Sequence, residues 1–396
     1  MGRTQRLRLV AMAATVTVIA TASYVPAAAG AVDVRASAAA ARTAQAAPAA
    51  LAADSEVVST VAPVLRPSGA SSRKYSTNEM RQVDARGGDP AVLAYWTPER
   101  MAAAKPLDAP GDSALVKKMA QEVATDLAAG LPAGQASTLS NAPVGDSAQG
   151  DTIVTHPVGP AGGEGATTNA IRRWPITTGK LFIGGYGSGS YCSASALNTR
   201  SKRVVLTAGH CLHSGRGGSW RSNLVFVPRF NGESDNKVPY GKFQARTLHT
   251  FRTWIEKGGT NQGWQRDVGM LTTYANGQGK RVVKAVGGNG LSIHESYRWP
   301  TTVFGYPYNL EGGKVMWGCQ GMTRKSGVAP RTSLISGCNF GEGSSGGPWV
   351  WHYDNNTRLG YVRGVTSYGT PRNRSIGSPH FDRAVRRLAA QTNNPA

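Results

Sequence analysis

From about residue 179 onward, the sequence is a series of short apolar runs separated by Gly, Asn, Ser and Pro. Many short strands with regular turns between them favour an all-β barrel or sandwich. A closing helix is expected, capped by Ser378 and started by Pro379, with Phe381, Val385 and Leu388 on one apolar face. The runs that carry the strand prediction are 180–183, 203–207, 224–227, 268–272, 303–306, 315–319, 333–336, 348–351 and 359–366.

The N-terminus has the pattern of an export signal. Three arginines within the first eight residues precede an apolar stretch at 9–21, and the small residues Ala27–Ala29 offer a cleavage site. A membrane anchor is the alternative, but the apolar run is short and is closed by Pro26 and a run of Ala. We therefore predict a signal peptide at 1–29, a secreted, extracellular protein, and no membrane span after signal removal.

Residues 30–170 are rich in Ala, Gly, Ser and Pro and contain few residues able to build a core. Helices are expected after Thr97, which can cap a helix with proline at its first position, and over 113–129. We predict a poorly structured, partly helical pro-segment and linker over 30–170, removed after export. A retained flexible stalk is the alternative. The abrupt change to core-forming sequence predicts a separate domain over 171–396.

The excess of positive over negative charge lies in the second part of the chain. The protein has 44 Lys+Arg and 23 Asp+Glu, a formal net charge of +21. Residues 1–170 contain 14 of each sign, so the whole excess lies after residue 170. No nucleic-acid motif accompanies this charge, so we expect no specific nucleic-acid partner. An anionic cell-wall or surface polymer is the partner class that the charge leaves open.

Two short segments carry candidate chemistry. An apolar run ends in a histidine beside a cysteine in Leu206–Cys211, and Ser345 lies in the glycine-dense stretch Gly341–Trp349. Glycines permit backbone angles that other residues avoid and let a substrate carbonyl approach the main chain. Consecutive N–H groups of such a turn can converge on a developing oxyanion. Ser345 is therefore a candidate nucleophile.

A nucleophilic serine needs a base, and the base needs an orienting acid. His210 is the candidate base. If the acid lies between the base and the nucleophile, only two aspartates qualify, Asp235 and Asp267. Asp235 lies in a polar turn, whereas Asp267 opens a buried-strand pattern where it can be held rigidly. The sequence therefore favours Asp267.

These residues resemble the chymotrypsin-like serine peptidases, specifically their secreted bacterial trypsin-like and glutamyl-endopeptidase-like branch. The matching motifs are T-A-G-H-C at 207–211, D-V-G-M-L at 267–271 and G-S-S-G-G-P at 343–348. The stretch 364–369 is similar to the strand that lines the specificity pocket in that family. The resemblance covers about residues 175–390. It implies two antiparallel six-stranded β-barrels, with the active site in the cleft between them, and a C-terminal helix.

The resemblance also implies roles. His210, Asp267 and Ser345 would form the catalytic triad, and the N–H groups of Gly343 and Ser345 the oxyanion hole. Ser367, Tyr368 and Gly369 would pair with the substrate as an extra strand. No cofactor is expected.

The specificity pocket departs from the better-known members of the family. Asn339 stands where trypsins have the acid that selects Lys or Arg, and Thr366 stands where glutamate-specific relatives usually have a histidine. Ser344 replaces the aspartate that pairs with a new N-terminus in animal trypsins, which indicates a different maturation. The residues implied to bind substrate are therefore Asn339, Thr366, Ser367, Tyr368 and Gly369, with the side-chain preference unassigned.

Four cysteines allow three pairings. The resemblance implies Cys192 with Cys211, and Cys319 with Cys338 would brace the wall before Ser345. No C-x-x-C spacing occurs, so no metal site is expected, and His213 is read as solvated loop sequence rather than as a metal partner of His210. His249 has no partner motif and is expected on the surface.

Two functions remain open on the sequence. The first is a secreted serine endopeptidase, expected to be a monomer and to act on polypeptides. The alternative is a non-catalytic binding module on a protease fold that holds an anionic polymer on its basic surface.

Overall fold

The structure is a computed structural model. It describes residues 54–65, 73–107, 117–118, 121–122, 124–125, 135–137, 171–184, 189–293, 295–327, 329–370 and 375–393. All of these lie in one compact unit, Ala49–Ala396. The predicted signal peptide and much of the predicted pro-segment lie outside the described residues. No helix within the described ranges is long and apolar enough to cross a membrane.

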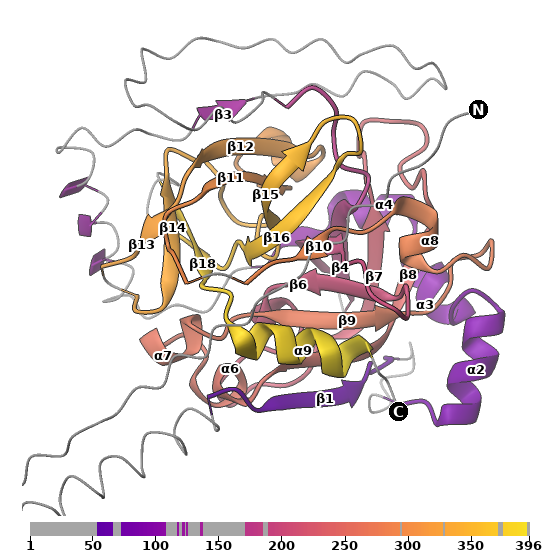
Figure 1. Ribbon diagram of the computed structural model, residues 1–396. Helices are drawn as coiled ribbons and strands as arrows, with labels where there is room; N and C mark the ends of the chain where they lie inside the picture. Colours follow the sequence, from indigo (N-terminus) through magenta and orange to yellow (C-terminus); the bar gives the residue numbers. More distant parts are fainter. Residues whose placement is uncertain are drawn as a thin grey trace, which may run out of the picture. The chain divides into compact units, whose positions relative to one another are not determined.

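The first half of the domain is a closed β-barrel (Figure 1). Six strands run in the order β8-β7-β4-β5-β6-β9, and pairing between β8 and β9 closes the ring. Buried apolar side chains from these strands fill the interior, which includes Leu181, Phe226 and Leu271. The strands are β4 (Thr178–Gly184), β5 (Ser190–Ala196), β6 (Val204–Thr207), β7 (Ser222–Pro228), β8 (Phe243–Phe251) and β9 (Gly269–Thr273).

The second half contains two sheets. A six-stranded sheet has the order β10-β16-β15-β11-β12-β3, and a four-stranded sheet has the order β13-β14-β18-β17. β12 contacts β14 and β16 contacts β18, so the two sheets enclose a second core around Val303, Ile335 and Trp349. The strands are β3 (Gln135–Ser137), β10 (Gly290–Leu291), β11 (Pro300–Gly305), β12 (Trp317–Met322), β13 (Arg324–Lys325), β14 (Thr332–Ser336), β15 (Pro348–Asp354), β16 (Leu359–Val365), β17 (Tyr368–Gly369) and β18 (Ser375–Pro379).

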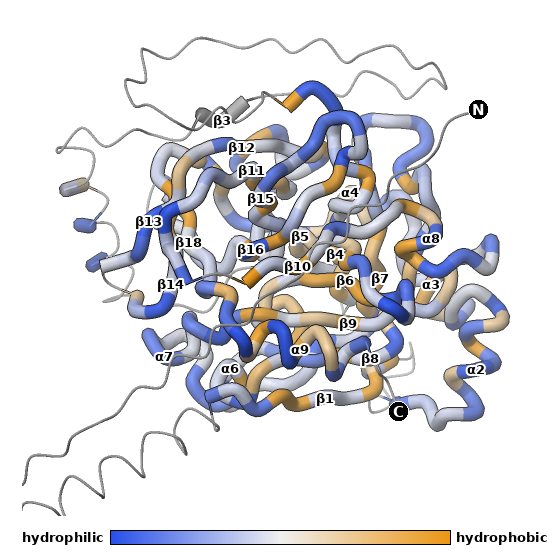
Figure 2. Tube along the Cα trace, in the orientation of Figure 1, coloured by the Kyte–Doolittle hydropathy of each residue, from blue (hydrophilic) through white to orange (hydrophobic). Residues whose placement is uncertain are grey.

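The predicted fold class is confirmed. The chain is mostly β, with a closed six-stranded barrel, a second set of sheets and a C-terminal helix. The hydropathy-coloured tube shows apolar residues along β4, β6 and β7 and mixed colouring on the helices (Figure 2). The remaining helices of this domain are short: α6 (Arg252–Lys257), α7 (Asn261–Trp264), α8 (Val282–Val286), and the 3-10 turns η1 (Gly209–Cys211) and η2 (Glu311–Gly313).

The C-terminal helix starts later than predicted. α9 spans Arg383–Asn393, and Asp382 accepts from the N–H of Ala384 at 2.9 Å. The predicted cap Ser378 and start Pro379 instead lie in β18, where Pro379 pairs with Thr332 of β14. Tertiary pairing with a neighbouring strand thus overrides the local start signal. The predicted apolar face is buried, and α9 contacts β8 and β9.

The segment before the barrel is ordered where it is described, contrary to the expectation of poor structure. It forms β1 (Val57–Val61), α2 (Thr77–Ala85), α3 (Pro90–Tyr95), α4 (Pro98–Ala103) and β2 (Lys105–Pro106). The helix predicted after Thr97 is confirmed as α4, and Thr97 caps it, since the Thr97 hydroxyl accepts from Arg100 N at 3.3 Å. Of the helix predicted over 113–129, residues 117–118, 121–122 and 124–125 are helical and the rest lies outside the described residues.

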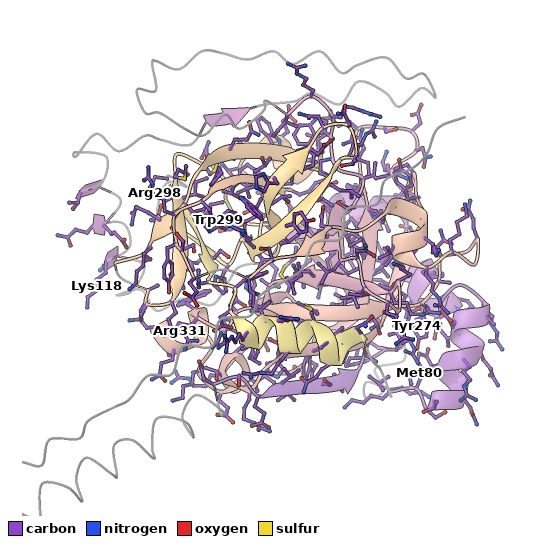
Figure 3. The ribbon with its side chains drawn as sticks, viewed as in Figure 1. Met80, Lys118, Tyr274, Arg298, Trp299 and Arg331 are labelled. Carbon is purple, nitrogen blue, oxygen red and sulfur yellow. A yellow bond between two sulfur atoms is a disulfide. The ribbon has the colours of Figure 1, made fainter. Side chains whose placement is uncertain are left out.

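This segment packs on the barrel with its few apolar residues. β1 extends the sheet by pairing with β8 from Val57 to Val61. The Trp96 side chain is fully buried against Phe182, and its indole N–H donates to Asn223 O at 2.8 Å. Met80 of α2 belongs to the same buried cluster as Tyr274, and both are labelled in Figure 3. A few widely spaced apolar residues are therefore enough to pack this segment on the barrel, because its helices place them on one face.

Candidate active site

His210 and Asp267 meet because the strands that carry them are paired. Thr207, the last residue of β6, is opposite Gly269, the first residue of β9. His210 follows in η1, and Asp267 precedes β9 by two residues. The imidazole Nδ1 lies 2.8 Å from Asp267 Oδ2, and the His210 backbone N–H donates to Oδ1 at 2.7 Å. Both side chains are fully buried.

The Asp267 carboxylate has a third partner. The Ser367 hydroxyl donates to Oδ2 at 2.5 Å. Three hydrogen bonds fix the carboxylate, so it can hold the imidazole in one orientation and one tautomer. Sequence reasoning assigned Ser367 to substrate pairing only, and its contact with Asp267 was missed. The rejected alternative, Asp235, lies exposed in a turn.

The Ser345 turn abuts the end of β6. A Cβ on Gly346, whose φ is +80°, would stand 2.0 Å from Thr207 Oγ1 and 2.9 Å from Ala208 N. Only glycine allows this approach, which sets Ser345 beside the turn that carries His210. Within the described part of the chain, the buried His210 Nε2 has no hydrogen-bond partner. The nitrogen that a triad uses as base is therefore available.

Two backbone hydrogen bonds orient the peptide bonds that carry the candidate oxyanion donors, the N–H groups of Gly343 and Ser345. Tyr308 N–H donates to Glu342 O at 2.7 Å, and Gly347 N–H donates to Ser344 O at 2.9 Å. In a trans peptide the C=O and N–H point in opposite directions. The N–H groups of Gly343 and Ser345 are consequently turned away from these contacts, and neither has an acceptor among the described residues. Both are thus free to meet a negatively charged oxygen.

Ser193 of β5 also holds the turn, a role that sequence reasoning missed. Its hydroxyl donates to Gly343 O at 2.8 Å and accepts from Tyr306 N at 2.9 Å. Its backbone N–H donates to Ser345 O at 2.7 Å. The side chain is fully buried. The sequence gives no signal for this role beyond the position of Ser193 next to Cys192.

The predicted disulfides are confirmed. Cys192 is bonded to Cys211 and Cys319 to Cys338. The first joins β5 to the turn that carries His210. Cys192, His210 and Cys211 lie close enough to hold a metal ion, but both sulfur atoms are in the disulfide and cannot ligate one.

Two histidines lie in other surroundings than expected. His213 is buried rather than solvated, its Nδ1 accepts from Gly215 N at 3.1 Å, and burial lowers its pKa. His249, expected on the surface, is buried between β8 and the N-terminal segment. The Ser59 hydroxyl lies 2.6 Å from its Nδ1, and burial lowers its pKa to about 4.

Among the predicted substrate-binding residues, Thr366 contacts the Ser345 turn directly, because its backbone carbonyl accepts from Gly346 N at 2.6 Å. Asn339 is exposed, and Asn309 Nδ2 donates to its carbonyl oxygen at 3.0 Å and to its Oδ1 at 3.2 Å. Thr366 is buried, and its hydroxyl accepts from Trp349 Nε1 at 3.1 Å. Tyr368 and Gly369 form β17, the last strand of its sheet among the described residues. An edge strand at this place can pair with an extended chain.

A histidine and an aspartate from one closed barrel thus meet a serine turn from the second half of the domain, in the order that the resemblance implies. This arrangement fits the double barrel that the resemblance to the chymotrypsin-like serine peptidases implies. The candidate catalytic residues lie where the two halves of the domain contact each other, since the Ser193 hydroxyl of the first barrel donates to Gly343 O of the Ser345 turn.

Comparison with known proteins gives matches among solved structures. No family model matches the chain, and no curated protein does. The protease Anisep from Arthrobacter nicotinovorans is 28% identical, with a TM-score of 0.49 over 55% of this chain and 96% of that chain. A thermostable serine protease, AL20, from an extremophilic microorganism is 27% identical, with a TM-score of 0.49 over 55% and 98%. A Glu endopeptidase is 18% identical, with a TM-score of 0.43 over 55% and 93%.

Proposed function

We propose that this protein is a secreted serine endopeptidase that hydrolyses peptide bonds through Ser345, His210 and Asp267. The observation that carries the proposal is the 2.8 Å contact between His210 Nδ1 and Asp267 Oδ2, which leaves Nε2 open beside the Ser345 turn. A buried imidazole held by a carboxylate is suited to take a proton from a hydroxyl.

The mechanism follows from this arrangement. Ser345 Oγ attacks the substrate carbonyl while His210 Nε2 takes the hydroxyl proton. The new oxyanion is bound by the N–H groups of Gly343 and Ser345, each worth about 3–4 kcal/mol of transition-state stabilisation. His210 then gives its proton to the leaving amine as the C–N bond breaks, which leaves an acyl-enzyme. A water molecule, deprotonated by His210, hydrolyses the acyl-enzyme and restores Ser345.

Substrate binding is proposed at the open edge of Ser367–Gly369, where an extended polypeptide adds as a further strand. Asn339 and Thr366 bring no formal charge to the pocket, so neither Lys or Arg nor Glu is favoured at the residue before the cut bond. We propose no cofactor and a monomeric enzyme.

Maturation is part of the proposal. Residues 1–29 would be removed on export, and 30–170 would act as the pro-segment of a zymogen whose catalytic domain is 171–396. The packing of Trp96 and the pairing of β1 with β8 support a pro-segment that binds its domain before removal. The second candidate function is a non-catalytic binding module. The 30 basic and 9 acidic residues after position 170 would allow such a module to bind an anionic cell-wall polymer.

The experiment is digestion of a peptide library by protein secreted from cells that express the full chain, with cut sites read by mass spectrometry. We expect discrete cuts with the parent chain and none with Ser345→Ala or His210→Ala, while Ser296→Ala, an exposed serine, cuts like the parent. Salt-sensitive binding to an anionic polymer, without any cut and unaffected by Ser345→Ala, would support the binding module instead.

A further inference from the structure

A carboxylate is seated in a site next to the candidate substrate strand. Glu122, from the helical stretch before the domain, accepts from Arg324 Nη1 at 2.7 Å, from the Ser326 hydroxyl at 3.1 Å and from Gly327 N at 2.5 Å. Its side chain is 12% exposed. In Figure 1 the short helical pieces of this stretch lie beside β13, which carries Arg324. A guanidinium, a hydroxyl and a backbone N–H together match the two oxygens of a carboxylate.

The domain itself holds these donors in place. Ser326 N–H donates to Thr332 O at 3.1 Å, and the Ser326 hydroxyl accepts from Ala329 N at 3.1 Å. Arg324 is paired with Leu334 in the β13–β14 hairpin. None of these contacts involves Glu122, so Arg324 and Ser326 are held by the domain and not by the segment that carries Glu122.

The site adjoins the wall along which substrate is proposed to run. The Tyr368 hydroxyl lies 2.8 Å from Thr332 Oγ1, and Thr332 is the residue that accepts from Ser326 N. The groups also interact electrostatically: burial raises the pKa of Tyr368 to about 12, and the negative charge of Glu122 acts in the same direction. The carboxylate site therefore lies at the far end of the Tyr368 side chain.

We propose that Arg324, Ser326 and Gly327 form a substrate subsite for an acidic side chain upstream of the cleaved bond, which Glu122 occupies in the full chain. This inference rests on the proposed peptidase function. It gives the enzyme a preference for an acidic residue upstream of the cut bond, which the pocket residues Asn339 and Thr366 do not provide. An acidic residue of a polypeptide aligned on Ser367–Gly369 replaces Glu122 after maturation.

The experiment uses secreted enzyme from cells that express the full chain and one cleavable peptide. The peptide is made in pairs that carry Glu or Gln at the second, third, fourth or fifth residue before the cut bond. We expect one position at which kcat/KM is about tenfold higher for Glu, the ratio that one charge-assisted contact gives. Arg324→Gln should reduce this ratio to below about twofold. Arg387→Gln, on the exposed face of α9, should leave it unchanged.

Active-site titration with a fluorophosphonate gives the concentration of active enzyme in each preparation, and kcat/KM is calculated with that concentration. Should Arg324→Gln not be secreted, Ser326→Ala removes one donor of the same site and is expected to lower the ratio. Equal cleavage of every Glu and Gln pair, or a Glu preference that survives in Arg324→Gln, would overturn the subsite. Absence of both cleavage and labelling would instead overturn the proposed function on which the subsite rests.

Discussion

Replacing Ser193 by Ala should impair catalysis without touching the triad. The hydroxyl donates to Gly343 O and accepts from Tyr306 N, and both bonds are buried. Its loss leaves a buried carbonyl and a buried N–H unsatisfied, at a cost of about 1–3 kcal/mol in the free energy of unfolding. The Gly343 carbonyl is then expected to tilt, and with it the turn that carries the proposed oxyanion donors.

The decrease in kcat expected for Ser193→Ala is smaller than the decrease caused by removing an oxyanion donor. Removing one oxyanion donor lowers kcat by about 10²–10³-fold. In Ser193→Ala both donors remain, because the freed Gly343 carbonyl belongs to the peptide bond that follows the one with the Gly343 N–H. We therefore expect a decrease of about tenfold in kcat with KM unchanged, since the donors act on the transition state.

The matched control lies on the same strand. Ser195 of β5 is fully buried, and within the described residues its hydroxyl has no hydrogen-bond partner, so Ser195→Ala should retain both stability and kcat. Steady-state kinetics on one peptide and urea unfolding of each variant test this. Equal kcat values for Ser193→Ala and Ser195→Ala would refute the argument that Ser193 positions the turn.

Three further predictions concern the proposed triad acid, a buried histidine and a disulfide. Asp267→Asn should keep the fold but lower kcat by about 10⁴-fold, because the amide favours the wrong imidazole tautomer; an unchanged kcat would exclude Asp267 as the acid. In the uncleaved chain, where Ser59 of β1 lies against it, His249 stays neutral in the folded state down to its pKa of about 4, whereas the unfolded chain takes up a proton below 6.5. Stability of the uncleaved chain should therefore fall as pH drops from 6.5 to 4, by up to about 3 kcal/mol, and urea unfolding of uncleaved His249→Gln should show a flatter profile over this range. Replacing Cys319 and Cys338 by Ser removes a link between residues 19 apart, and the free energy of unfolding should decrease by about 3 kcal/mol; no change would contradict the chain-entropy argument.

The sequence predicted what depends on local pattern and order. Short apolar runs indicated the strands, and the scarcity of acidic residues between His210 and Ser345 singled out Asp267, whose 2.8 Å contact with the imidazole agrees with that choice. The resemblance gave the Cys192–Cys211 pairing, which needs knowledge of which strands are neighbours.

The sequence could not predict what depends on long-range packing. Ser193 and Tyr308 hold the Ser345 turn through backbone carbonyls, and no side-chain pattern marks such contacts. The start of α9 was misplaced because β14 pairs with Pro379. His249 was predicted at the surface, but β1 pairs with β8 there, with Ser59 opposite His249.

Labelling of Ser345 tests the central claim most directly. Secreted protein from cells that express the full chain would be treated with a fluorophosphonate, digested, and the modified peptide identified by mass spectrometry. We expect one adduct, on Ser345, that is lost in His210→Ala and kept in Ser296→Ala. A folded protein that takes up no label, or that is labelled on Ser345 equally well without His210, would contradict the proposal that His210 and Ser345 act together.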